Sequence, residues 1–196
     1  MALSENSADR HREVAGTFSS VVSAVSDWDA PTPVAQWTTR DVVGHLTTWF
    51  PGFLLDAVGI DVAASVDVAQ DPVRAWTEQA QNVQRVLDDP ERSAQTFEHQ
   101  HIGPQSVTSC IDMIYTPDVF MHSWDLARGA GVDLQLDPDF AATMLSGMTA
   151  MEDAMRSSGQ YGPAVTIPAD APEQHKLLAF IGRNPYWPDE VPPLDS

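Results

Sequence analysis

The run Asp118-Val119-Phe120-Met121-His122-Ser123-Trp124-Asp125-Leu126-Ala127-Arg128 carries the pattern that decides the fold of this 196-residue chain. Tyr115, Asp118, His122 and Leu126 recur at helical spacing and share one face of a helix. The flanks of this face are apolar, so we expect it to turn inward. An unpartnered buried carboxylate is costly, and Asp118 therefore needs a cation or a hydrogen-bond donor.

The helix around this run is predicted to span residues 105–128 and to include a buried Cys110. Gly129 and Gly131 are stop signals, and Pro117 predicts an internal break after Thr116. A break there places Asp118 near a fresh helical start.

Five more helices are predicted from apolar stripes and capping signals. The first covers residues 8–26, and the second begins at Thr38 with Asp41 three residues on and contains Pro51, which should kink or divide it. The third begins at Asp71-Pro72 and ends near residue 87. The fourth begins at Asp137-Pro138, with a core stripe of methionines, and the last covers residues 171–181; the stripe is Met144, Met148, Met151 and Met155.

The connections indicate how these helices are arranged. Residues 59–70 form a connection long enough to cross the end of a bundle, which permits the helices on either side to run parallel. Residues 88–104 fit a loop or an extended stretch, and other strand signals are nearly absent. We therefore predict an all-α bundle in a single domain, residues 1–196, with a bundle core at 1–135 and a helical C-terminal extension at 136–196 packed on it.

Composition excludes several classes of partner. Lys and Arg total 10 against 28 Asp and Glu, a net charge of −18 that repels nucleic acid and anionic membranes. With no spanning apolar run and no signal peptide, we expect a cytoplasmic protein. Cys110 is the only cysteine, which excludes an internal disulfide and a cysteine-rich metal site.

Asp118 and His122 lie one helical turn apart and can bind a single divalent cation. The best third ligand is His45, which interrupts an apolar helical stripe. Two imidazoles and a carboxylate match catalytic zinc sites, and also suit iron or nickel. The alternative is an Asp118–His122 ion pair or a capping role for Asp118, with His45 as a hydrogen-bonded core residue.

Other polar and aromatic residues have secondary assignments. Asp125 can orient the His122 ring or pair with Arg128, and Arg183 is expected in a structural pairing. We expect His99 and His101 in an exposed loop in preference to a second metal site, and His11 and His175 at the surface. The residues expected to surround the metal ligands as hydrogen-bond partners or pocket walls are Asp125, Trp124, Trp49 and Tyr115.

Three stretches together resemble the actinobacterial metal-binding branch of the DinB-like superfamily: residues 37–46, residues 118–131, and the tail Leu177-Leu178-Ala179-Phe180-Ile181-Gly182-Arg183-Asn184-Pro185. That superfamily includes the N-terminal domain of mycothiol-dependent maleylpyruvate isomerase and the bacillithiol transferases. The resemblance implies a four-helix bundle with a long crossover between its second and third helices. It also implies a metal held by His45, Asp118 and His122, with Asp118 a shorter arm than the glutamate of the isomerase.

This resemblance implies a metal-dependent thiol S-transferase or isomerase-like enzyme that uses mycothiol or a related thiol and an electrophilic substrate. A bound cation lowers the pKa of a thiol and generates thiolate. The isomerase has a further C-terminal domain at its active site, and this chain shows no comparable one. The alternatives are a non-catalytic metal-binding or ligand-binding bundle and a metal-dependent hydrolase; a homodimer remains open.

Overall fold

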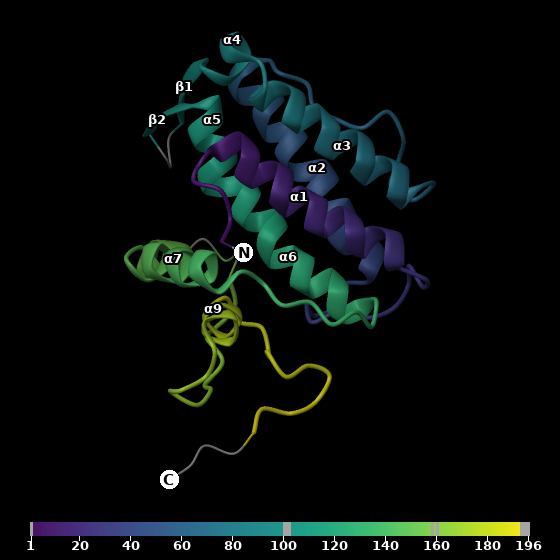
Figure 1. The fold of residues 1–196 in the computed structure, drawn as a ribbon, viewed down its shortest axis with the longest axis vertical. Coiled ribbons are helices and arrows are strands. Elements are labelled where there is room, and N and C mark those ends of the chain that lie inside the picture. Colours follow the sequence, from purple (N-terminus) through teal and green to yellow (C-terminus); the bar gives the residue numbers. More distant parts are fainter. Residues whose placement is uncertain (1, 100–102, 158, 160, 193–196) are drawn as a thin grey trace.

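The computed structural model describes residues 2–99, 103–157, 159 and 161–192. The chain is mostly helical, as predicted (Figure 1). Within the described residues, no helix combines the length and apolarity needed to cross a bilayer. The elements in chain order are α1 (Ser7–Ala24), α2 (Thr39–Val58), α3 (Pro72–Leu87), α4 (Pro90–Ser93), β1 (Thr96–His99), β2 (Gly103–Ser106), α5 (Val107–Cys110), η1 (Ile111–Tyr115), α6 (Thr116–Gly129), α7 (Pro138–Thr149), α8 (Glu152–Ser157) and α9 (Glu173–Phe180).

The predicted helix starts agree with the observed N-caps. The Thr38 and Asp41 pair forms a capping box at the start of α2, and the Asp71 and Asp137 side chains cap α3 and α7. The predicted division at Pro51 is wrong, because α2 runs through it to Val58. Fully buried core side chains on both sides of this proline hold the helix together despite the lost hydrogen bond.

The predicted break at Pro117 is also absent. Instead η1, a π-helical turn, ends two residues before the proline, and the N–H of Thr116 donates to the carbonyl of Ile111, five residues back. The wider turn accommodates a proline in the first turn of α6 without interrupting the continuous helical segment formed by α5, η1 and α6. Asp118 therefore lies in the first turn of α6, as the predicted break also implied.

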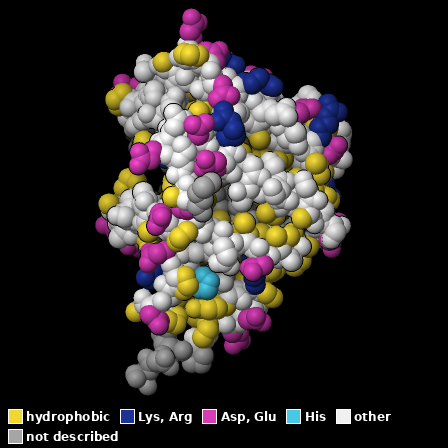
Figure 2. Space-filling view, in the orientation of Figure 1, with side chains coloured by type: hydrophobic (Ala, Val, Ile, Leu, Met, Phe, Trp, Pro, Cys, Tyr) yellow, Lys and Arg dark blue, Asp and Glu magenta, His cyan; other side chains and the backbone are white. Residues whose placement is uncertain are grey.

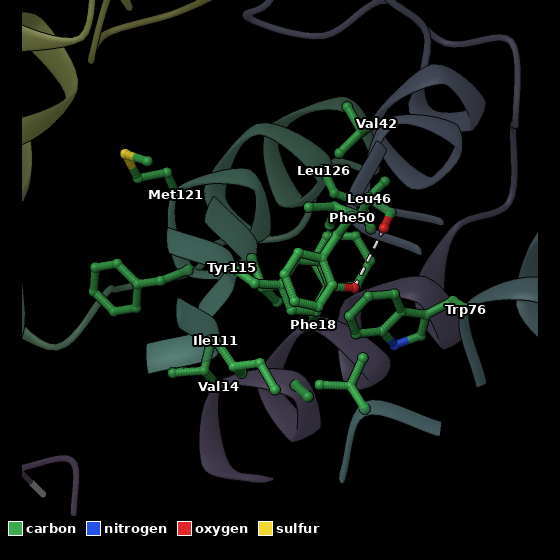
Figure 3. Packing of buried hydrophobic residues seen from close by; sticks show 14 of the residues in the cluster. Val14, Phe18, Val42, Leu46, Phe50, Trp76, Ile111, Tyr115, Met121 and Leu126 are labelled. Atoms are coloured by element: carbon green, nitrogen blue, oxygen red, sulfur yellow. Dashed lines mark hydrogen bonds between the residues drawn. The ribbon is translucent and has the colours of Figure 1, made fainter. Parts of the chain in front are cut away.

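A common core joins α1, α2, α3, η1 and α6 (Figure 3). Phe18 of α1 packs on Trp76 of α3 with ring centroids 4.3 Å apart, and Phe50 of α2 stacks on Tyr115 of η1 at 4.1 Å. The surface position predicted for His11 is wrong: its ring is fully buried beside Tyr115. Amphipathic stripes on several helices thus meet in one interior.

The long connection after α2 returns along the helices. Asn82, near the end of α3, donates to the carbonyl of Val62, whereas Val68 lies against Gly44 and accepts from Arg40 at the start of α2. The connection therefore carries the chain from the end of α2 back to its beginning. As a result α3 starts beside the start of α2 and runs in the same direction (Figure 1).

A small hairpin occupies the segment for which the sequence left loop and extended structure open. Strands β1 and β2 pair antiparallel, with Thr96 opposite Ser106. The chain is mostly helical, consistent with the all-α prediction, and a four-residue ladder adds one small sheet where Phe97 packs against the core. The backbone of His99 belongs to β1, and His101 lies outside the described residues.

The C-terminal part lies to one side of the other helices, with α7 and α9 packed on each other (Figure 1). Phe140 of α7 contacts Phe120 of α6 with centroids 4.9 Å apart. The predicted methionine core stripe is wrong in part: Met144 is buried, but α7 ends at Thr149 and Met151 is 57% exposed. On the visible surface, acidic side chains are scattered among fewer basic ones (Figure 2), as the net charge of −18 requires.

Candidate metal centre

Two helices bring the three predicted ligands together. His45 comes from α2, Asp118 and His122 come from α6, and these two helices pack on each other. One Asp118 oxygen, Oδ2, lies 3.1 Å from His45 Nε2, and the other, Oδ1, lies 3.5 Å from His122 Nε2. One ligand atom from each residue lies within 4.8 Å of the other two. The convergence spans 73 residues of sequence between His45 and Asp118.

Two tryptophans flank these side chains. The Trp49 indole N–H donates to Asp118 Oδ2 at 2.9 Å. Trp37 stacks on His122 with centroids 5.6 Å apart and contacts the His45 ring at 5.1 Å. Trp49 was expected near the ligands, but Trp37 was not singled out by spacing. It lies in the turn before α2, where helical periodicity carries no information.

Asp125 contacts the Nδ1 atom of the His122 ring, and Arg183 contacts Asp125. His122 Nδ1 lies 2.9 Å from Asp125 Oδ2, and Arg183 Nε lies 3.0 Å from Asp125 Oδ1. The Asp125 side chain is 0% exposed. The alternative pairing with Arg128 does not occur, because Arg128 donates to the backbone carbonyl of Trp187. Asp125 thus has the orienting position, with an arginine from beyond α9 as its counter-charge.

The charges of the centre shift the pKa values in opposite directions. Burial alone raises the pKa of the Asp118 carboxyl, but the His122 charge and hydrogen bonds from His45 and Trp49 outweigh it and bring this pKa below its ordinary value. Burial alone lowers the pKa of His122, but the carboxylates of Asp118 and Asp125 outweigh it and raise this pKa. The arrangement therefore favours an anionic Asp118 with a positive charge next to it.

The tautomer of His122 makes that positive charge necessary. The ionised Asp125 carboxylate only accepts hydrogen bonds, so the proton of a neutral His122 ring sits on Nδ1. Its Nε2 lone pair then faces the Asp118 carboxylate, which is unfavourable unless a proton or a metal ion lies between them. The separations of 3.1 and 3.5 Å join the two imidazole nitrogens to different oxygens of Asp118, so this carboxylate lies between the two rings.

The centre can be reached from outside. The His45 side chain is 30% exposed and that of Asp118 is 18% exposed, whereas the His122 side chain is buried. The half-buried Tyr161 comes from the connection between α8 and α9. Burial is the larger cause that raises the pKa of its phenol, and the charge of Asp118 raises this pKa further. Sequence spacing gave no signal for Tyr161, because it lies in an irregular segment far from the ligands.

Three other singled-out residues contribute packing in this structure. The Tyr115 hydroxyl donates to the carbonyl of Leu46 at 3.3 Å, and burial raises the pKa of this phenol (Figure 3). Trp124 is buried, with the Arg128 guanidinium over its ring. Cys110 is buried as predicted, and burial raises the pKa of its thiol to about 12, so thiolate does not form at neutral pH.

The chain is similar to known proteins over most of its length. The family profile described as "Mycothiol maleylpyruvate isomerase N-terminal domain" matches residues 11–127, which include all three predicted ligands and Asp125. Two similar relatives are the uncharacterized proteins Rv0738 and MT0763 of Mycobacterium tuberculosis, from strains ATCC 25618 / H37Rv and CDC 1551 / Oshkosh. Each is 26% identical over 180 residues, covering 88% of this chain and 95% of the relative. No solved structure matches the chain significantly.

Proposed function

This chain belongs to the mycothiol maleylpyruvate isomerase N-terminal domain family, and from this premise we propose that it is a metal-dependent thiol S-transferase. His45, Asp118 and His122 bind a divalent ion, zinc in the first place. The core formed by α1, α2, α3 and the continuous helical segment α5–η1–α6 is a DinB-like four-helix bundle. The substrates are a mycothiol-type thiol and a small electrophile.

One observation carries the metal assignment: one ligand atom each from His45, Asp118 and His122 lies within 4.8 Å of the other two. The hydrogen bond from His122 Nδ1 to Asp125 leaves the Nε2 atom of His122, 3.5 Å from Asp118 Oδ1, to coordinate. His45 completes a set of two imidazoles and one carboxylate, the set found in catalytic zinc sites that keep an open position. A protein without cysteine ligands would bind zinc in this way.

The role in thiol chemistry follows from the surroundings of the ligands. A divalent ion in this position supplies a positive charge that lowers the pKa of a thiol reaching it. Trp37 and Trp49 place aromatic surface beside the ligands, against which the apolar part of a substrate can pack. The exposed edge of His45 is the side from which a thiol and its electrophile enter. Cys110 takes no part, because its thiol is buried and protonated.

Metal content and thiol turnover test the proposal together. We expect purified protein to carry stoichiometric zinc, His122→Ala to lose it, and His175→Ala, a histidine on α9 outside the centre, to retain it. We also expect mycothiol-dependent consumption of a model electrophile, and its loss in His45→Ala. Equal trace metal in all variants would refute the metal site. Stoichiometric metal without thiol-dependent turnover would leave a metal-binding protein and refute the transferase.

A further inference from the structure

Arg183 lies well beyond the family-matching residues 11–127, yet it is an integral part of the candidate metal centre. Its Nε atom lies 3.0 Å from Asp125 Oδ1 and 3.3 Å from Oδ2, and its terminal Nη2 lies 3.2 Å from Oδ2. Asp125 Oδ2 is also the atom that contacts His122 Nδ1. A continuous contact therefore joins the C-terminal segment, through Asp125, to one predicted metal ligand.

The backbone turn at the end of α9 places Arg183 next to Asp125. Gly182 adopts φ +87°, and the Arg183 N–H donates to the carbonyl of Leu178 at 2.8 Å, which ends the helix and turns the chain toward α6. A side chain at Gly182 would also meet the backbone of Gly162 and Pro163 at 3.2 Å. The position therefore requires glycine for two independent reasons, and the resulting turn fixes where Arg183 points.

The chemical effect of Arg183 follows from where it holds Asp125. The guanidinium contacts both oxygens of the Asp125 carboxylate, and one of these oxygens, Oδ2, lies 2.9 Å from His122 Nδ1. Without these contacts the carboxylate can turn away from Nδ1, and the single proton of the neutral ring can then sit on Nε2, the atom that faces Asp118. A neutral ring with its proton on Nε2 has no lone pair for a metal at that atom.

We propose that Arg183 is a positioning residue for the metal centre: it holds the Asp125 carboxylate against His122 Nδ1, so that the Nε2 lone pair of His122 faces the metal. This inference rests on the proposed metal site, and it adds the C-terminal segment to that site as a functional part. A merely structural role would be to dock the C-terminal segment on α6. Arg128 provides the comparison, because it also links α6 to that segment, through Trp187, without contacting Asp125.

Two matched variants, Arg183→Gln and Arg128→Gln, separate these roles. Zinc affinity is measured by competition with a chelator, and the His122 tautomer is measured by ¹⁵N NMR of the metal-free protein in alkaline buffer, where the ring is neutral. We expect Arg183→Gln to weaken zinc binding by about 10- to 100-fold and to move the His122 proton toward Nε2. Arg128→Gln should leave both quantities near wild type.

Unchanged affinity and tautomer in folded Arg183→Gln would overturn the inference, as would equal losses in Arg128→Gln. If Arg183→Gln does not fold, Arg183→Lys is used, which keeps the charge but not the contact of two guanidinium nitrogens with Asp125. Weaker zinc binding and a shifted His122 proton in that variant would support the inference, and wild-type values would overturn it. A wild-type protein that binds no zinc refutes the proposed function separately. In that case the tautomer comparison still decides whether Arg183 controls the His122 ring.

Discussion

Lowering the pH should weaken metal binding by an amount set by the protons that the ion displaces. In the metal-free protein the His122 Nδ1 proton is bonded to Asp125, so the proton added on titration sits on Nε2, the atom that must coordinate. Burial lowers the pKa of His122, but Asp118 and Asp125 outweigh it and raise this pKa above the ordinary 6.5. Proton competition should therefore begin at a higher pH than for an ordinary histidine.

The magnitude follows from this count. Below the His122 pKa, one displaced proton raises the zinc Kd about tenfold for each pH unit, or about 1.4 kcal/mol. The pKa of Asp118 is lowered, since the His122 charge and the hydrogen bonds outweigh burial, so this carboxylate stays ionised and adds no proton near neutral pH.

Isothermal titration of zinc at several pH values, each in two buffers with different ionisation enthalpies, measures affinity and proton release together. We expect release to rise toward one proton from His122 as the pH falls below its pKa, with a parallel loss of affinity. Affinity that stays flat between neutral and mildly acidic pH, with no proton release, would refute coordination through His122 Nε2.

Three further predictions test the packing and the hydrogen bonds. Gly129→Ala should cost about 1–3 kcal/mol in urea unfolding, because its new methyl group meets a neighbouring threonine methyl at 2.7 Å, whereas Gly16→Ala, with open space around it inside α1, should stabilise by up to about 1 kcal/mol; equal effects would contradict the close packing. Burial lowers the pKa of His11 below its unfolded value of 6.5, so its contribution to stability is full above pH 6.5 and is lost as the pH falls below it, by at most about 1.4 kcal/mol per pH unit. His11→Gln should flatten the acid side of the stability curve, and an unchanged curve would argue against this burial. Trp49→Phe keeps an aromatic ring but removes the indole N–H that is donated to Asp118, so chelator competition should show about tenfold weaker zinc binding; wild-type affinity would show that this hydrogen bond is unimportant.

Much of the helical framework was accessible from local patterns. The starts at Thr38, Asp71 and Asp137 were predicted because a capping side chain acts within its own first turn. The pairing of Asp118 and His122 was predicted because the helical repeat fixes which residues share a face. The hairpin segment was left open between loop and extended structure, and the π-helical turn was not predicted. The burial of His11 was also not predicted, since it depends on contacts with distant segments such as Gln84.

The amino-acid sequence by itself determined the positions of two candidate ligands, the apolar faces that must meet, and the acidic surface, because helical periodicity and charge act over a few residues. Only the tertiary structure decided that His45 arrives 3.1 Å from Asp118, that Trp37 covers both imidazole rings, and that Arg183 stands behind Asp125. Except for the local contact of Trp37 with His45, these contacts join residues 58 or more positions apart in the sequence. Such approaches depend on how whole helices pack, and no local pattern encodes that packing.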